Sequence, residues 1–365
     1  MKIADRFLNL QTYTPIEPYD VLSKKLGFLP EKIIKLDANE NPYGPAPAVK
    51  QGLADLNFIN IYPDPESRTL RKAIAEFTGV DQKNLMVGAG ADELIDLLLR
   101  VLLNPGDSVI NCPPTFGMYS FDTYLNNGVI RSTNRNADFS INVKEITKVV
   151  SDYSPKIIFL TSPNNPDGGL ISETQLLEVL KLPVLVVLDE AYIEFTGDTK
   201  DDWKQNSHIQ WVSKSNNLVV LRTFSKWAGL AGLRVGYGAF PEWLLPTLWA
   251  TKQPYNVNIA ASHAAIQSLE SLDFLSANIQ KIREERTILY DLLNTVPFLT
   301  PLPSESNFIL CRVKDKSGIE IKKYLETQGI LVRYYDTPLL KNYIRISIGK
   351  HRDHIRLIQV LEEMK

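Results

Sequence analysis

The stretch VLVVLDEAYIEF, residues 184–195, decides the predicted fold. It begins with five apolar residues in a row, and the run ends at an acidic residue, Asp189. A strand that is apolar on both faces is typical of a parallel sheet with helices on either side. Similar runs, separated by helical or loop segments, are SVINC (108–112), VIRST (129–133), KIIFLT (156–161) and LVVLRT (218–223). The sequence therefore predicts an α/β fold, with a large domain in which helices sandwich a mainly parallel sheet.

The pattern changes from about residue 258, where a long helical stretch leads to a second set of strand-like segments. These segments are NFILCRV (307–313), ILVRYY (330–335) and YIRISIG (343–349). They predict a smaller α+β domain, for which we expect residues 31–44 and 256–365. We expect a large domain over 45–255 and an N-terminal arm over 1–30. Because open α/β sheets bind ligands at the carboxyl ends of their strands, a crevice between the domains is the expected site.

Composition narrows the class of protein. The chain has 365 residues, 44% of them hydrophobic and 22% charged, which suffices for two domains that share a large core. A net charge of −2 provides no basic field for nucleic acid, and no apolar run has membrane-spanning length. The two cysteines, Cys112 and Cys311, lie far apart, which argues against a disulfide framework or a thiolate metal site. We expect a cytoplasmic protein with small-molecule partners, without nucleic acid or membrane.

Two histidines near the end of the chain, His351 and His354, are three residues apart and could share one helix face. A solvated basic face of that helix explains the pair better than a metal site. We therefore expect no metal ion.

The stretch VGAGADEL (87–94) predicts a strand, a turn of small residues and the start of a helix. It is not a GxGxxG motif, because Glu93 takes the place of the last glycine, and no GK[ST] follows as in a P-loop. The free N–H groups and the positive dipole end of a helix start suit a phosphate. The alternative is an ordinary tight turn with Asp92 or Glu93 in the first helical turn.

Two loops follow predicted strands at the same edge of the sheet. The loop CPPTFGMYS (112–120) contains Phe116, which could stack on a flat ring or simply belong to the core. The loop TSPNNPDGG (161–169) contains Asn165, which could donate a hydrogen bond into the crevice. Tight turns explain the prolines and glycines of this loop well, but its two adjacent asparagines less well.

Asp189 ends its apolar strand, and a carboxylate in that position is costly unless it is paired. The partner would be a cation in the crevice, either a side chain or a protonated ring nitrogen. Tyr192, three residues on, adds a phenol. The alternative is an aspartate that caps a helix.

The stretch LRTFSKWAGLAGLRVGYG (221–238) places a single lysine, Lys226, among small and apolar residues. Desolvation lowers the pKa of such a lysine, so its free amine becomes available for a Schiff base. Thr223, Ser225 and Arg234 offer two hydroxyl groups and a guanidinium that suit a phosphate. The alternative is a lysine that snorkels at a strand end beside a glycine-rich turn.

Each of these features has an ordinary structural explanation, but their order along one sheet is harder to explain without a ligand. Together they form a site for a phosphorylated pyridine aldehyde. Asp189 would keep the pyridine nitrogen protonated, and Asn165 and Tyr192 would hydrogen-bond the 3-oxygen of the ring. Lys226 would hold the aldehyde as a Schiff base and then transfer a proton.

Over nearly its whole length the chain resembles the fold-type I pyridoxal-phosphate aminotransferases, with an aspartate-aminotransferase-like fold, and within them the histidinol-phosphate aminotransferases. The segments that carry the resemblance are LDANENPYGP (36–45), YPDPESRTLRKAIAEFTGV (62–80), VGAGADELID (87–96), PTFGMY (114–119), SPNNP (162–166), DEAYIEF (189–195), RTFSKWAGLAGLRVGY (222–237), SNFIL (306–310), VRYYD (332–336) and YIRISIG (343–349). The lysine segment, DEAY and SPNNP indicate the fold and cofactor. YPDP and GLAGLRVGY indicate the histidinol-phosphate branch, although aromatic aminotransferases and threonine-phosphate decarboxylases share much of them.

The resemblance implies pyridoxal 5′-phosphate as the cofactor, with Lys226, Asp189 and Tyr192 as catalytic residues. The further cofactor contacts that it implies are Ala91, Asp92, Phe116, Asn165, Thr223, Ser225 and Arg234, together with Tyr62, which would reach the cofactor phosphate of the neighbouring subunit in a homodimer. The substrate contacts that it implies are Tyr19, Asn307, Arg333 and Arg345. Arginine forks accept both the phosphate and the carboxylates of the implied substrates.

The implied reaction exchanges an amino group between L-histidinol phosphate and 2-oxoglutarate, giving imidazole acetol phosphate and L-glutamate in histidine biosynthesis. It would be a ping-pong transfer through Lys226. Alternatives are an aromatic amino-acid aminotransferase, a decarboxylase of a phosphorylated amino acid, and a non-catalytic ligand-sensing module. Two residues depart from the family pattern: Asp167 stands in place of a threonine, and Trp227 in place of a smaller residue.

Overall fold

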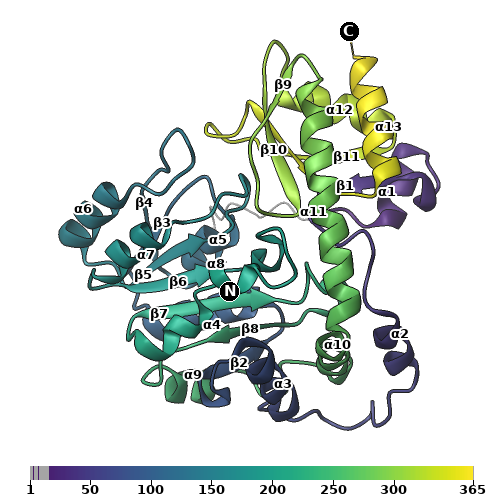
Figure 1. Ribbon diagram of the computed structural model, residues 1–365. Coiled ribbons are helices and arrows are strands. Elements are labelled where there is room, and N and C mark those ends of the chain that lie inside the picture. The colour runs from purple at the N-terminus through teal and green to yellow at the C-terminus, as the bar shows by residue number, and fades with distance from the viewer. Residues whose placement is uncertain (1–2, 4–6, 8–15, 365) are drawn as a thin grey trace.

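The computed structural model describes residues 3, 7 and 16–364 of the chain. The arm predicted over residues 1–30 therefore lies partly outside the described residues, and its described part contains helix α1 (Tyr19–Leu26). The described chain forms one large and one small sheet, each with its own helices (Figure 1). The expected domain boundaries remain predictions.

The large sheet has seven strands in the order β2-β8-β7-β6-β5-β3-β4. Their bounds are β2 (Leu85–Gly88), β3 (Ser108–Asn111), β4 (Val129–Ser132), β5 (Ile157–Thr161), β6 (Leu185–Asp189), β7 (Leu218–Thr223) and β8 (Gly236–Ala239). Strands β3 to β7 pair in parallel, whereas β8 is antiparallel to both β7 and β2. The predicted mainly parallel sheet is confirmed. Strand β8 was not predicted, because its sequence GYGA lacks the β-branched residues that mark a strand.

Helices cover both faces of the large sheet. On one face lie α4 (Ala91–Leu102), α5 (Met118–Leu125) and α9 (Leu245–Thr251), and on the other lie α3 (Arg68–Thr78), α6 (Val143–Tyr153) and α7 (Glu173–Leu180). Successive residues of β6 alternate between two cores, since Val187 belongs to one and Val186 and Leu188 to the other. Burial of such a side chain contributes about 1.5–3 kcal/mol, so the strand is held from both sides.

The small sheet has five strands in the order β1-β11-β12-β10-β9. Their bounds are β1 (Ile34–Leu36), β9 (Leu299–Pro301), β10 (Phe308–Val313), β11 (Ile330–Tyr334) and β12 (Tyr343–Ser347). Strand β1 pairs in parallel with β11, and the other pairs are antiparallel. An early segment of the chain thus completes a sheet built from its last third.

The helices of this part run from α10 to the end of the described chain. They are α10 (Ile259–Glu270), α11 (Leu272–Asn294), α12 (Gly318–Thr327) and α13 (His351–Glu362), while α2 (Pro47–Ala54) and α8 (Trp203–Asn206) are short helices of the earlier chain. Helix α11 extends from the region of α10 to the small sheet (Figure 1). Its Arg283 is buried and donates to the carbonyl oxygen of Thr196 at 2.6 Å, which ties α11 to the loop after β6.

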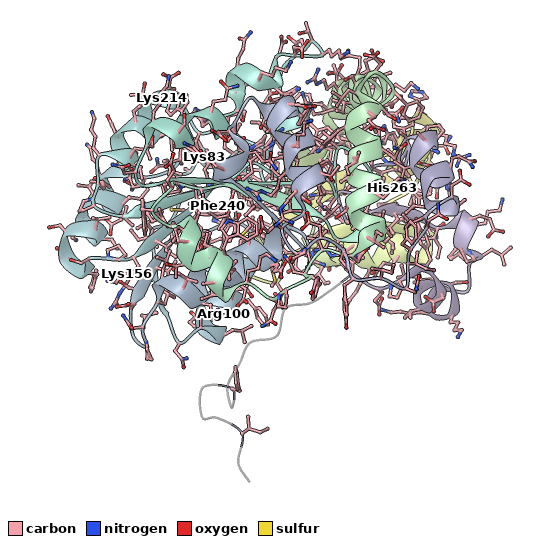
Figure 2. The ribbon with its side chains drawn as sticks, turned by 90° about the horizontal axis from the view of Figure 1, so that it is seen from below. Lys83, Arg100, Lys156, Lys214, Phe240 and His263 are labelled. Carbon is pink, nitrogen blue, oxygen red and sulfur yellow. The ribbon has the colours of Figure 1, made fainter. Side chains whose placement is uncertain are left out.

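The amino ends and the carboxyl ends of the strands in the large sheet face different surroundings. Lys83, Lys156 and Lys214 precede β2, β5 and β7, and they lie on the side of the molecule away from His263 on α10 (Figure 2). At the carboxyl ends, the register aligns Thr161 of β5 with Asp189 of β6. The polar residues that end the strands therefore share one edge of the sheet.

The expectation of a solvated histidine pair on the last helix is wrong for one member. His354 is fully buried, lies 3.0 Å from Glu285 through its Nδ1, and accepts a hydrogen bond from the backbone N–H of Gly349. Burial lowers the pKa of His354 to about 4. This histidine is thus a neutral core residue, and only His351 is exposed. None of the described helices is long and apolar enough to span a membrane.

Candidate active site

A pocket of about 140 Å³ lies at the carboxyl ends of β5, β6 and β7, beside the start of α4. It is lined by the residues that the sequence indicates for a cofactor: Ala91, Asp92, Phe116, Asn165, Asp189, Tyr192, Thr223, Ser225, Lys226 and Arg234. The other lining residues are Thr161, Ala191 and Ala231. The motifs therefore meet in space as their order predicts, while the role of each residue stays a prediction.

One end of the pocket is suited to an anion. Helix α4 begins after Gly90, which has φ 85° and provides no side-chain cap, so N–H groups of the first turn remain available. The guanidinium of Arg234 lies beside this turn, 2.9 Å from Asp92 and 3.5 Å from the hydroxyl of Ser225. The positive φ of Gly90 favours glycine here, and the missing Cβ leaves room for the guanidinium of Arg234 beside the turn. A phosphate would meet helix N–H groups, a hydroxyl and a guanidinium here.

The buried carboxylate of Asp189 would be stabilised by a positively charged partner. It accepts hydrogen bonds from the Tyr119 hydroxyl at 2.6 Å and the Ala191 backbone N–H at 2.9 Å. Among the described residues, no lysine, arginine or histidine forms an ion pair with it. Desolvation raises the pKa of Asp189 to about 6, although the hydrogen bond from Tyr119 opposes the shift. A protonated nitrogen in the pocket would remove this penalty.

Lys226 is the nucleophile candidate of the pocket. Its Nζ donates to the carbonyl oxygen of Ala38 at 3.2 Å and lies 5.8 Å from the ring centre of Tyr192. Desolvation, together with the positive charge of Arg345, lowers the pKa of Lys226 to about 8. A substantial fraction of free amine therefore exists near neutral pH.

Arg345 of β12 connects the small sheet to the pocket. Its guanidinium donates to Asn165 Oδ1 at 2.6 Å and to the Asp37 carbonyl oxygen at 2.7 Å, and its side chain is almost fully buried. Its Nε has no hydrogen-bond partner among the described residues. Arg333 is the register neighbour of Arg345 on β11. Two arginines thus lie side by side on the small sheet, and Arg345 reaches the pocket residue Asn165, although neither arginine lines the pocket itself.

Comparison with known proteins agrees with this geometry. Residues 31–361 match the family described as aminotransferase class I and II. The chain belongs to the class I and II aminotransferases. Histidinol-phosphate aminotransferase from Nicotiana tabacum (chloroplastic) is 51% identical over 99% of this chain and 86% of its own length, and the enzyme of that name from Dehalococcoides mccartyi is 45% identical over 98% and 99%. The predicted family and transaminase class are confirmed.

The aminotransferase also has a close structural neighbour. A crystal structure of histidinol-phosphate aminotransferase from Sinorhizobium meliloti, in complex with pyridoxal-5′-phosphate, superposes with a TM-score of 0.88 over 100% of this chain and 99% of that one. At 24% identity, this likeness establishes the fold alone. It confirms the predicted aspartate-aminotransferase-like architecture.

Several functional candidates of this aminotransferase were not predicted from the sequence. Tyr119 holds Asp189, Asn39 donates to the hydroxyl of Tyr192 at 3.0 Å, and Tyr335 lies 3.4 Å from Asn165 Oδ1. Tyr119 lies in the first turn of α5 and packs edge-on against Phe116 of the preceding loop, so the only signal for it was its place within the motif PTFGMY. No local signal exists for Asn39, because its partner lies more than 150 residues away.

Other predicted contacts of the aminotransferase lie outside the lined pocket. Tyr62 is 79% exposed and stacks on Tyr255 at 4.6 Å, and Tyr19 is 44% exposed at the start of α1. Asn307 is fully buried and donates to the Asn39 carbonyl oxygen at 2.9 Å, while its own Oδ1 has no partner among the described residues. Neither tyrosine contacts the pocket within one chain.

The two departures from the family pattern have different outcomes. Trp227 is 1% exposed and stacks on Phe77 with ring centres 5.6 Å apart, so its ring belongs to the hydrophobic core. Asp167 keeps the turn that was expected of it, because it accepts from the Gly169 backbone N–H at 2.9 Å and from the amide of Asn164. Neither residue lines the pocket.

Proposed function

We propose that this aminotransferase exchanges an amino group between L-histidinol phosphate and 2-oxoglutarate in histidine biosynthesis, with pyridoxal 5′-phosphate as its cofactor. The decisive observation is that two buried ionisable groups line the same pocket and have no counter-ion among the described residues: the carboxylate of Asp189, whose pKa is raised, and the amine of Lys226, whose pKa is lowered. The names of relatives that match nearly the whole chain support this substrate.

The residues present fit the cofactor. The unpaired carboxylate of Asp189 suits a protonated pyridine nitrogen, and the start of α4 with Arg234 and Ser225 suits the phosphate. Ala91 and Asp92 would add backbone N–H groups, and Thr223 a hydroxyl; Phe116 would stack on the ring, with Asn165 and Tyr192 near its oxygen. When bound, pyridoxal phosphate supplies an electron-accepting ring and an aldehyde carbon that takes up an amine.

Lys226 would perform the proton transfer in each half of a ping-pong reaction. Its neutral Nζ would accept a proton from Cα of the amino substrate in the first half and deliver a proton to Cα of the former 2-oxo acid in the second half. A pKa of about 8 keeps both the neutral amine and the ammonium form of Lys226 accessible near neutral pH, because burial disfavours the ammonium. Asp189 would contribute by stabilising the protonated pyridine nitrogen of the cofactor.

The two arginines would select the substrates. L-Histidinol phosphate carries a phosphate and 2-oxoglutarate carries carboxylates, and a guanidinium fork accepts both. Arg345 offers a buried Nε–H that has no partner among residues 3, 7 and 16–364, and Arg333 is its register neighbour. Tyr19 and Asn307 would contact the same end of the substrate.

A homodimer would complete the site. Tyr62 follows an exposed apolar segment in which Phe58, Ile59 and Ile61 are 69%, 75% and 56% exposed. Exposed apolar residues in a cluster indicate an interaction surface, and a second copy of the chain would cover it. In that arrangement Tyr62 would reach the cofactor phosphate of the neighbouring subunit. A cytoplasmic location is part of the proposal, although the plant relatives are described as chloroplastic.

A substrate panel tests the proposed reaction. We expect histidinol phosphate to give the highest kcat/KM, ahead of phenylalanine, tyrosine and phosphothreonine, with 2-oxoglutarate as acceptor. A preference for phenylalanine or tyrosine would favour an aromatic aminotransferase, and release of CO₂ from phosphothreonine would favour a decarboxylase. Failure of glutamate to change the visible absorption of the holoenzyme would indicate a non-catalytic ligand sensor.

A further inference from the structure

Tyr192 lines the pocket with a hydroxyl group whose hydrogen bonding is one-sided. The hydroxyl accepts from Asn39 Nδ2 at 3.0 Å, and the ring is held edge-on by Phe308 at 5.1 Å. A phenol has a single proton to donate. Within the part of the chain that the structure describes, no group accepts that proton. The proton therefore remains available to a ligand in the pocket.

The orientation of the Asn39 amide depends on Ser347 at the end of β12. The Ser347 hydroxyl accepts from the Asn39 backbone N–H at 2.8 Å and donates to Asn39 Oδ1 at 2.9 Å. Both residues are buried, with exposures of 1% for Asn39 and 2% for Ser347. If the amide were turned over, the buried Ser347 proton would have no acceptor among the described residues, which is unfavourable. Ser347 thus directs the NH₂ group of Asn39 toward Tyr192.

The backbone of Asn39 is fixed as well. Its φ is 54°, in the left-handed region that asparagine tolerates better than most residues. The Asn307 amide donates to its carbonyl oxygen at 2.9 Å, and Lys226 Nζ donates to the preceding carbonyl oxygen, that of Ala38. A segment of the small domain therefore approaches both Tyr192 and the candidate nucleophile.

We propose that Asn39 and Ser347 are positioning residues that hold Tyr192 as a hydrogen-bond donor toward the ligand. The acceptor would be the 3-oxygen of pyridoxal phosphate, so this inference rests on the proposed cofactor. Because Asn39 always donates to the Tyr192 oxygen, the phenol proton points away from it and into the pocket. Ser347 lies two residues after Arg345 on the same strand, so one strand of the small domain supports both the substrate arginine and the donor state of Tyr192.

A double-mutant cycle tests this role. The variants are Asn39→Ala, Tyr192→Phe and their combination, each loaded with pyridoxal phosphate. The measured quantities are the pH midpoint of the visible absorption band and the Kd of pyridoxal phosphate for the apoprotein. When the nitrogen that links Lys226 to the cofactor loses its proton, the negative charge on the 3-oxygen is stabilised only by hydrogen-bond donors of the protein. Without the Tyr192 donor, the deprotonated form is less stable. Removing the Tyr192 donor should therefore raise the midpoint, by about one pH unit.

The expected pattern is specific. Asn39→Ala should raise the midpoint by part of the Tyr192→Phe shift, and the double variant should match Tyr192→Phe alone, because Asn39 acts through Tyr192. Ser347→Ala, which frees the amide to turn over, should shift the midpoint in the same direction and have no further effect when it is combined with Tyr192→Phe. Asn84→Ala is the matched control, since this buried asparagine donates to the Phe240 carbonyl oxygen at the amino end of β2. It should leave the midpoint unchanged.

Two results would overturn the inference while leaving the proposed function intact. One is a wild-type midpoint in both Asn39→Ala and Ser347→Ala. The other is an Asn39→Ala shift that adds fully to that of Tyr192→Phe, which would indicate a general structural role. A wild-type protein without a visible band on addition of pyridoxal phosphate would refute the proposed cofactor and this inference together.

Discussion

Two buried charges on neighbouring strands of the large sheet differ in whether the fold supplies a counter-ion. Arg222 of β7 is fully buried and forms an ion pair of 2.6 Å with Glu194, which is itself almost fully buried. Asp189 of β6 is equally buried, yet among the described residues it receives only neutral hydrogen-bond donors. The first charge is paired within the fold, whereas the second lines the pocket. Burial alone therefore does not mark a functional charge. Asp189 is singled out because it lines the pocket and also lacks a counter-ion among the described residues.

The largest effect is expected from Lys226, the other buried ionisable group that lines the pocket. Lys226→Ala should lower turnover by at least about 10⁴-fold, because both the covalent attachment and the proton transfer are lost. Steady-state kinetics on the pyridoxal-phosphate-treated variant measures this. Lys156→Ala, at the opposite end of the strands, is the control and should retain wild-type activity. Turnover by the Lys226 variant within tenfold of wild type would refute the assigned role.

Asp189→Asn separates function from stability at the unpaired charge. We expect turnover to fall by about 10²–10³-fold, because the amide cannot stabilise a protonated ring nitrogen. The unfolding free energy of the apoprotein at pH 7 should stay the same or increase, since an uncompensated buried carboxylate is removed. Parallel kinetics and urea denaturation measure the two quantities. A marked loss of unfolding free energy in this variant would contradict the conclusion that the buried Asp189 carboxylate lacks a stabilising counter-ion.

Arg222→Met should show the opposite pattern. The change leaves Glu194 buried without its partner, so the unfolding free energy should fall by about 3–5 kcal/mol. Turnover per folded molecule should stay within a few-fold of wild type, because neither residue lines the pocket. Urea denaturation of the variant checks the first expectation. The double change Arg222→Met with Glu194→Leu should recover much of the loss, and failure to do so would point to a role beyond the pair.

The smallest expected effect is a pH dependence of the unfolding free energy of the apoprotein. The pKa of Asp189 rises from 3.8 to about 6 on folding, so the folded state binds this proton more tightly than the unfolded state. Its contribution to stability is therefore fully present below about pH 4 and is lost as the pH rises through about 6, a change of roughly 3 kcal/mol. The difference in unfolding free energy between wild type and Asp189→Asn across pH 4–7 measures it. Added pyridoxal phosphate should abolish the decline, because its ring nitrogen supplies the missing cation.

The sequence predicted the pocket well because the relevant residues occur at strand ends. Asp189, Asn165 and Lys226 each follow an apolar run, and parallel strands bring their carboxyl ends to one edge. The sequence could not reveal Asn39, whose side chain joins residues 153 and 308 positions away. It also misjudged His354, because the periodicity of a helix does not show which neighbour covers a given polar side chain.

The two sources of information thus determine different properties of this aminotransferase. The sequence by itself determined the parallel sheet, the order of the motifs and the family, because apolar runs and turn residues act locally. Only the tertiary structure decided which buried charges are paired, that Trp227 belongs to the core, and that Asn39 and Tyr119 donate hydrogen bonds to Tyr192 and Asp189. The reason is physical: hydrogen bonds and desolvation depend on distances between groups that the chain brings together only when it folds.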